Sequence, residues 1–151
     1  MVTSGELPQI GFIRGNTWAR TYAMYGKDDQ DANVPFSLDG ITDIRMDVRD
    51  KPTEDGTLYA RLRIGSGITK LTGDDSHKFT LNIDRETSLA FVPNASPFQG
   101  SVVIQGTRTS ATFNGKYYAD IAFFVGDEVK TLLKATVYVI ANITSLTDET
   151  A

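Results

Sequence analysis

Carboxylates carry most of the potential chemistry in this 151-residue chain, which has one histidine and no cysteine. The densest group consists of four oxygen-bearing side chains, Asp28, Asp29, Asp31 and Asn33. A calcium-binding EF-hand loop that began at Asp29 would need glycine at its sixth position and glutamate at its twelfth. The sequence has Val34 and Gly40 at those positions. It therefore favours a solvated hairpin loop and predicts no metal site here.

His77 is the second candidate, because Asp74 and Asp75 precede it in a turn-like segment and could orient it as a general base. A hydrolytic triad would also need a serine on a strained elbow, and no GxSxG motif is present. A metal site would normally require a second histidine or a cysteine. We therefore interpret His77 as an exposed turn residue and predict no catalytic residue.

Asp120 is the third candidate, because it interrupts the apolar run Tyr-Tyr-Ala-Asp-Ile-Ala-Phe-Phe. A pair of carboxylates is enough for glycoside hydrolysis, but the sequence alone gives no separation between any two of them. An acid inside such a run more often ties down a loop or caps backbone amides. Asp120 is accordingly predicted to be a buried structural residue, and the protein is predicted not to be an enzyme and to bind no cofactor.

The length, charge and cysteine content of the chain limit the classes of protein to which it can belong. The length suits one domain, residues 1–151, with a core at about 12–144 and polar ends at 1–8 and 145–151. The net charge of −4 argues against nucleic-acid binding, which needs a clustered basic face. The chain has no cysteine and therefore no disulfide. Its first residues do not resemble a secretory signal, so we expect no export. No apolar run is long enough to span a membrane, so we expect no membrane insertion.

Apolar residues recur with period two, which is typical of β-strands rather than helices. The pattern is clear at Ile44, Met46 and Val48, and it recurs within residues 57–64 and 78–84. The runs at 117–125 and 134–144 are more continuously apolar, so we expect central strands covered on both faces. The predicted fold class is all-β and mainly antiparallel, as a single small sandwich or flattened barrel.

Turn residues separate these strands. Residues 14–49 are interpreted as a strand, a polar hairpin loop and a second strand. Asn114-Gly115 and the Gly126-Asp127-Glu128 segment are expected to close tight hairpins. Residues 93–101, with two prolines, are expected to be an irregular loop. The one short helical turn is predicted within 84–91, capped by Asp84.

Aromatic side chains in the last strands exceed what one face of a small sheet needs. The possible interface residues are Tyr117, Tyr118, Phe123, Phe124 and Tyr138. They could form a subunit interface, where tyrosine and phenylalanine are enriched, or fill both faces of a central strand. Both alternatives remain open on the sequence. Trp18 and Gly40, together with Asp120, are interpreted as structural residues rather than site residues.

An ordered set of short motifs resembles a family of small bacteriophage virion domains, best described in the N-terminal domains of baseplate upper proteins. The motifs begin with Arg14-Gly15-Asn16-Thr17-Trp18 and continue through Asn33–Ile41, Arg45–Arg49, Gly67-Ile68-Thr69, Glu86-Thr87, Tyr117–Ile121 and Val129–Val139. Their order is kept from about residue 12 to 144. Asn16 replaces the usual aspartate, Lys134 or Ala135 stands where a turn glycine is expected, and 92–113 resembles an insertion.

This resemblance implies a non-enzymatic virion protein of the tail or baseplate, made in the bacterial host cytoplasm. We expect it to form a homo-oligomer, such as a trimer or hexamer, and to connect or anchor other virion proteins. The alternative is a β-sandwich that binds carbohydrate or a host surface, or a head-fibre or decoration protein. A hydrolase is a third hypothesis, but no motif supports it.

Overall fold

The computed structural model describes residues 4–6, 9–104 and 107–140, and β-strands dominate them. The expected polar end 145–151 lies outside these residues, as do 141–144 of the expected core and residues 1–3, 7 and 8. In the described part of the chain, eleven strands form one sheet and two more form a separate pair. The predicted all-β, mainly antiparallel class is confirmed.

The strands follow one another closely along the chain. Their bounds are β1 (Ser4–Glu6), β2 (Ile10–Ile13), β3 (Trp18–Ala23), β4 (Tyr25–Lys27), β5 (Asn33–Pro35), β6 (Asp43–Arg49), β7 (Leu58–Ile64), β8 (Gly67–Lys70), β9 (Lys78–Ile83), β10 (Phe98–Ile104), β11 (Thr107–Phe113), β12 (Gly115–Val125) and β13 (Glu128–Ile140). The sheet order is β11-β10-β2-β13-β12-β6-β7-β8-β9-β3, and β1 also pairs with β13. The expected polar N-terminal end thus includes a paired strand, β1.

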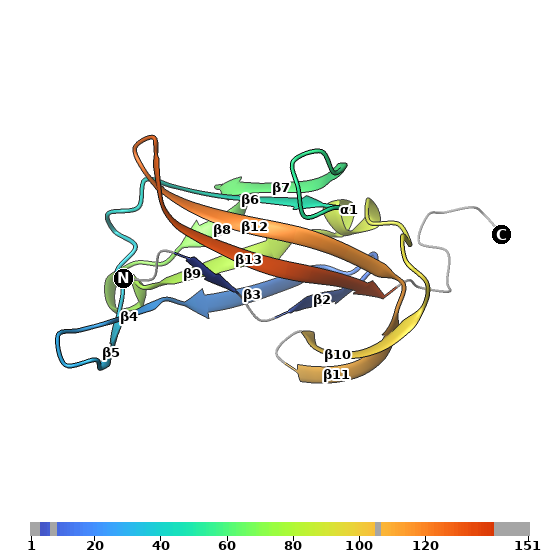
Figure 1. The fold of residues 1–151 in the computed structure, drawn as a ribbon, viewed down its shortest axis with the longest axis horizontal. Helices are drawn as coiled ribbons and strands as arrows, with labels where there is room; N and C mark the ends of the chain where they lie inside the picture. The colour runs from blue at the N-terminus through green and yellow to red at the C-terminus, as the bar shows by residue number, and fades with distance from the viewer. Residues whose placement is uncertain (1–3, 7–8, 105–106, 141–151) are drawn as a thin grey trace.

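The sheet curls over on itself, so that β12 and β13 lie across the core from β3 and β9 (Figure 1). Phe79 of β9 meets Phe123 of β12 edge-to-face, with ring centroids 5.3 Å apart. One cluster of buried apolar side chains extends from Ile10 to Val139 and includes Trp18. The row of side chains that alternation assigned to the core, Ile44, Met46 and Val48, is buried in it, and so are Trp18 and Tyr22 of β3.

The longest strands are covered on one face, not on both as the sequence suggested. Along β12, Tyr117, Ala119 and Ile121 are buried, whereas Asp120 between them is exposed and Tyr118 is half-buried. The curled sheet has a single interior, so only alternate side chains reach it. The expectation failed because half-buried aromatic residues on the outer face make the run look uniformly apolar.

One predicted hairpin and one predicted loop differ from the structure. Asn114-Gly115 does not close a hairpin, because β11 pairs with β10 and β12 pairs with β13 and β6. Residues 98–101 belong to β10 and not to an irregular loop. The apparent insertion 92–113 therefore contains the β10–β11 hairpin, which curves away from the body of the sheet (Figure 1). By contrast, the expected turn at Gly126 does join β12 to β13.

The strand–loop–strand interpretation of residues 14–49 was wrong about pairing. β3 pairs with β9 and β6 pairs with β12 and β7, so the two strands lie far apart in the sheet order. The polar loop between them contains its own short pair, β4–β5. Alternation correctly identified the buried side chains of each strand, but it carries no information on which strands become neighbours.

The predicted helical turn is α1 (Arg85–Leu89), and Asp84 caps it by accepting a hydrogen bond from the Thr87 N–H at 2.7 Å. A 3-10 turn, η1 (Gly73–Asp75), was not expected. Ser88 of α1 accepts a buried 2.7 Å bond from the Gly15 N–H, which ties the β2–β3 connection to the helix. No helix in the ranges that the structure describes has the length and apolarity needed to span a membrane.

Candidate functional site

The acidic loop at the tip of β4–β5 uses its first carboxylate for its own backbone. Asp28 Oδ1 accepts hydrogen bonds from the N–H groups of Gln30 and Ala32, both at 2.9 Å. Asp31 adopts a left-handed φ of 62°, which aspartate tolerates in turns. Among the described residues no group of three or more His, Cys, Asp or Glu side chains could hold a metal ion. The Asp28 carboxylate therefore stabilises the turn of the β4–β5 hairpin.

His77 is buried, with 8% of its surface exposed, so the expectation of an exposed turn histidine was wrong. Its ring lies edge-to-face with Tyr25, at a centroid distance of 5.4 Å. Its carbonyl accepts a hydrogen bond from the Met24 N–H at 2.8 Å, which brings the end of β3 across this turn. Sequence reasoning saw only the neighbouring acids and missed this long-range contact.

The five aromatic residues proposed as an interface divide between the two faces of the sheet. Tyr117 and Phe123 are core residues, with 0% and 1% exposure, so neither is available to a partner. Tyr118, Phe124 and Tyr138 lie on the outer face and are half-buried. The guanidinium of Arg45 covers the Phe124 ring at 4.4 Å, and Tyr138 packs against Phe98 and Phe113 of the β10–β11 hairpin.

Trp18 and Gly40 differ in how far the structure supports a structural role. Trp18 is a core residue with 1% exposure, although its indole N–H has no hydrogen-bond partner within the described residues. Gly40 is exposed and has no positive φ, and a Cβ added there would meet no atom within 4 Å. No local geometry at Gly40 requires glycine.

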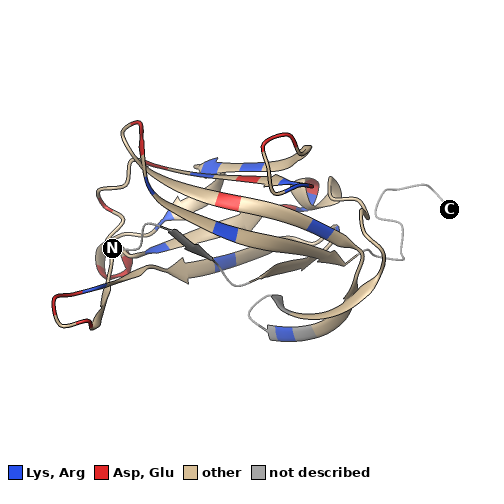
Figure 2. Cartoon of the chain, viewed as in Figure 1, with Lys and Arg blue, Asp and Glu red and all other residues tan. Residues whose placement is uncertain are grey.

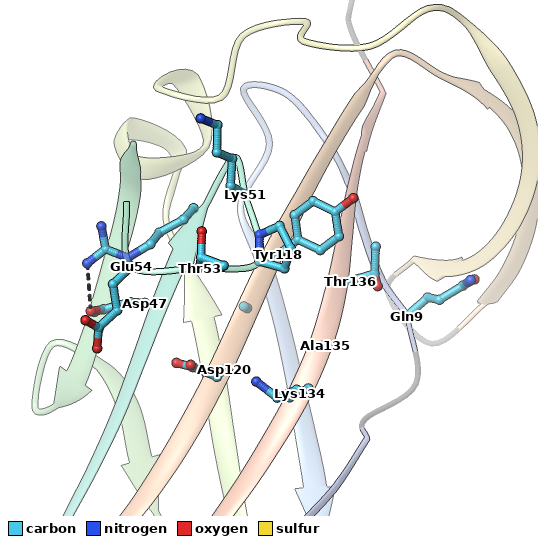
Figure 3. Close-up of a pocket in the computed structure, with 13 residues that line it drawn as sticks. Gln9, Asp47, Lys51, Thr53, Glu54, Tyr118, Asp120, Lys134, Ala135 and Thr136 are labelled. Carbon is cyan, nitrogen blue, oxygen red and sulfur yellow. Dashed lines mark ion pairs between the residues drawn. The ribbon is translucent and has the colours of Figure 1, made fainter. Parts of the chain in front are cut away.

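Asp120 is exposed on the outer face of the sheet, not buried as predicted. It lies on the floor of a groove of about 710 Å³ that runs over β6, β12 and β13 (Figure 3). The β6–β7 loop, residues 50–57, forms one side of this groove, and Gln9 lies at its other side towards the β10–β11 hairpin. β12 carries Asp120 outward because its neighbours Ala119 and Ile121 point into the core.

A row of charged side chains crosses four strands through this floor. Lys134 lies opposite Asp120, Asp120 opposite Asp47, and Asp47 opposite Arg61. Asp47 accepts hydrogen bonds from Arg61 Nε at 3.0 Å and from Arg63 Nη1 at 3.2 Å, and Arg49 Nη2 lies 3.7 Å away. Burial opposes ionisation of Asp47, but the hydrogen bonds and charges of Arg61 and Arg63 outweigh it and lower its pKa.

Asp120 and Lys134 contrast with this paired group. Neither side chain forms a hydrogen bond or ion pair with the part of the chain that the structure describes. In Figure 3 their ends lie over the sheet, open to the groove. Of the three carboxylates that line the groove, Asp47 is engaged by arginines, whereas Asp120 on the floor and Glu54 in the β6–β7 loop have no such partner among the described residues.

A second hollow, of about 320 Å³, adjoins the first, because Gln9 lines both. The rings of Phe98, Phe113 and Tyr138 form its apolar side, with centroids 5.4 to 5.9 Å apart. Tyr118 lies in the first hollow, with the Lys116 ammonium 5.6 Å from its ring centroid. The two hollows are thus neighbours that share Gln9, and each has an aromatic lining.

Sequence reasoning selected Asp120 and Tyr118 but missed the rest of the groove. Gln9, Arg49, Lys51 and Thr136 come from three separated segments, and only the sheet register brings them together. The alternation in β6 and β7 did place Asp47 and Arg61 on outer faces. Lys and Arg predominate along the strands, whereas most Asp and Glu lie in loops and turns (Figure 2). Asp47 of β6 and Asp120 of β12 are among the acidic residues that lie within strands.

Comparison with protein-family models and with curated proteins finds no match to this chain.

Proposed function

We propose that this protein is a non-enzymatic structural component of a bacteriophage tail or baseplate, which oligomerises and connects or anchors larger virion proteins. One observation carries the assembly part of this proposal. The sheet ends in β11, a seven-residue strand that pairs only with β10 in the described chain. An unpaired strand edge presents backbone N–H and C=O groups that a neighbouring chain can complete.

The β11 edge has few of the features that proteins commonly use to block such pairing, and Arg108 is the one charged residue in it. Its sequence, Thr-Arg-Thr-Ser-Ala-Thr-Phe, has no proline or lysine, and its pairing with β10 runs over seven residues without a bulge. Short edges, lysine, proline and bulges are the usual protections. The β-branched threonines also favour an extended strand. This edge is suited to pair with another chain.

The other end of the sheet is β3, which pairs only with β9 among the described strands. Because β11 and β3 are different edges, pairing between copies would join β11 of one to β3 of the next. Head-to-tail contacts of this kind close into rings when the rotation between copies permits. A ring, such as the expected trimer or hexamer, suits a component arranged about a tail axis.

The resemblance supports the phage assignment. Its motifs are spread over strands that build the core, with Trp18 in β3, Met46 in β6 and Ile121 in β12 all buried. The departure at 92–113 contains the β10–β11 hairpin, and this hairpin carries the unpaired edge. A difference from the family pattern therefore coincides with the surface proposed for assembly.

Native mass spectrometry of the purified full chain tests the assembly step. We expect a closed oligomer, and we expect Ser110→Lys to reduce it to monomers, because a lysine on the edge strand opposes pairing. Thr69→Lys is the matched control: its side chain is also exposed, but β8 lies inside the sheet between β7 and β9. A monomeric wild-type protein, or equal dissociation by both variants, would contradict ring formation through β11.

Peptide identification in assembled particles tests the phage assignment separately. Purified virions from the encoding phage should contain peptides of this chain at a copy number that is a multiple of the ring size. Their absence from intact particles, while the protein is present in the infected-cell lysate, would refute a virion role even if the purified protein forms rings.

A further inference from the structure

The groove over β6, β12 and β13 has a volume that suits a small ligand. Its larger part has a volume of about 710 Å³ and its smaller part about 320 Å³, and they meet at Gln9. Small-molecule sites in proteins typically enclose roughly 300–1,000 Å³. The groove is open towards solvent, between the β6–β7 loop and the β10–β11 hairpin (Figure 3).

The charges around the groove balance. The larger part is lined by three acidic residues and three basic residues, namely Asp47, Glu54, Asp120, Arg49, Lys51 and Lys134. A phosphate or nucleic-acid site would need an excess of positive charge, and a cation site would need converging carboxylates. A balanced set of donors and acceptors instead suits a neutral ligand with many hydrogen-bonding groups.

The backbone of the floor limits what kind of polymer can bind. β12 pairs with β13 on one side and with β6 on the other, so its N–H and C=O groups are already used within the sheet. An extended peptide could not add as a strand at this place, and peptide recognition of that kind needs a free edge. A ligand over this floor must be bound by side chains alone.

Two side chains supply complementary contacts at the centre. The Tyr118 ring lies in the floor and offers an apolar face with a polar tip. Asp120, two residues along the same face of β12, is an exposed carboxylate with no partner among the described residues. A pyranose ring presents C–H groups on one face and adjacent hydroxyls at its edge, so it can stack on the tyrosine while its hydroxyls donate to the carboxylate.

We propose that this groove binds a neutral oligosaccharide, with Tyr118 as the stacking ring and Asp120 as the principal hydrogen-bond acceptor. Gln9, just before β2, and Thr136 of β13 also line the groove and add donors and acceptors. Arg49, which lines the groove, lies 3.7 Å from Asp47, and Asp47 is itself held by Arg61 and Arg63, so ion pairs of the sheet fix this part of the site. This binding is a function separate from oligomerisation through β11.

The test is a chemical-shift titration of the isotope-labelled full chain. The probes are neutral tetrasaccharides of glucose, galactose, mannose and N-acetylglucosamine, with a sulfated galactose tetrasaccharide and inorganic phosphate as anionic probes. We expect at least one neutral probe to shift the amide signals of Tyr118, Asp120 and Thr136. Binding by the anionic probes alone, or shifts confined to other surfaces, would overturn the proposal.

Matched variants locate the binding energy. Tyr118→Ala and Asp120→Asn should each weaken binding by about tenfold, the usual scale for losing a well-placed contact, while Tyr118→Phe should retain most of the affinity. The controls are Tyr25→Ala and Asp29→Asn, which change the same residue types on exposed positions of the β4–β5 hairpin. If Asp120→Asn binds the glycan as tightly as the wild type, or if the control variants lose as much affinity as the groove variants, the glycan does not bind at the assigned site.

Discussion

Asp120 lies directly opposite Asp47 across the β12–β6 pair, so two carboxylates are neighbours on the outer face of the sheet. Like charges directly opposite on antiparallel strands destabilise the pair. Asp47 is compensated by Arg61 and Arg63, whereas Asp120 has no ion pair within the described chain. Both acids line the groove, and the one without an ion pair is free to contact a ligand, which is consistent with a binding role that costs some stability.

Replacing Asp120 should therefore stabilise the fold. We expect Asp120→Asn to raise the free energy of unfolding by about 0.2–1 kcal/mol, the usual scale of a cross-strand pair. Lys134 also lies opposite Asp120, on β13, but forms no ion pair with it, so we expect the attraction that is lost to be smaller than the repulsion that is removed. Urea unfolding of a double-mutant cycle with Asp47→Asn measures the coupling. If Asp120→Asn changes the free energy of unfolding equally in the wild-type and Asp47→Asn backgrounds, the two carboxylates do not repel each other.

Removing Asp47 should have the opposite effect. Asp47→Asn leaves Arg61 and Arg63 without their carboxylate, and we expect a loss of about 1 kcal/mol, because the group is partly exposed. The lowered pKa means that the wild-type advantage is complete above the unfolded pKa of about 3.9 and is lost as the pH falls through the folded pKa. Unfolding measured from pH 7 down to pH 2 should show the two proteins converging; a constant difference would contradict the assignment.

Two buried tyrosines should respond differently to loss of the hydroxyl. Tyr117 donates to the Val92 carbonyl, whereas the Tyr22 hydroxyl has no partner among the described residues. We expect Tyr117→Phe to cost about 1 kcal/mol and Tyr22→Phe to cost nothing or to stabilise, because an unpaired buried hydroxyl is itself unfavourable. Equal losses in chemical denaturation would mean that Tyr22 has a partner after all.

The same tyrosines predict a loss of stability in alkali. Burial raises the pKa of each phenol to about 12. The unfolded chain releases these protons near pH 10, so stability is complete below pH 10 and declines as the pH rises from about 10 to 12. Each phenylalanine variant should flatten this decline in a pH series of unfolding measurements. A decline that is unchanged in the double variant would assign it to other groups.

Glycines at positions 67 and 40 should differ in their tolerance of alanine. Gly67 has a φ of +99°, and a Cβ there would lie 2.5 Å from Leu62 Cδ2. Gly67→Ala should therefore cost about 2 kcal/mol or more. Gly40→Ala should be neutral or stabilising by up to about 1 kcal/mol, because the position is open and has no positive φ. Comparable melting temperatures for the two variants would contradict this contrast.

Local sequence patterns predicted much of the fold because they depend on short-range geometry. Alternation identified the buried sides of β3, β6 and β9, since successive side chains of a strand point to opposite faces. Asp84 was recognised as a helix cap because the capping bond spans only three residues, to Thr87. The two-residue turn at Gly126 was equally local.

The tertiary structure decided everything that depends on which strands become neighbours. The sequence marked Asp120 as unusual, but only the register between β12, β6 and β13 placed it on the outer face between Asp47 and Lys134. His77 became buried because β3 and β4 lie across it, and β11 paired with β10 although an Asn-Gly pair precedes β12. Period-two patterning determines the face on which a side chain lies, whereas long-range packing of the whole sheet determines its neighbours.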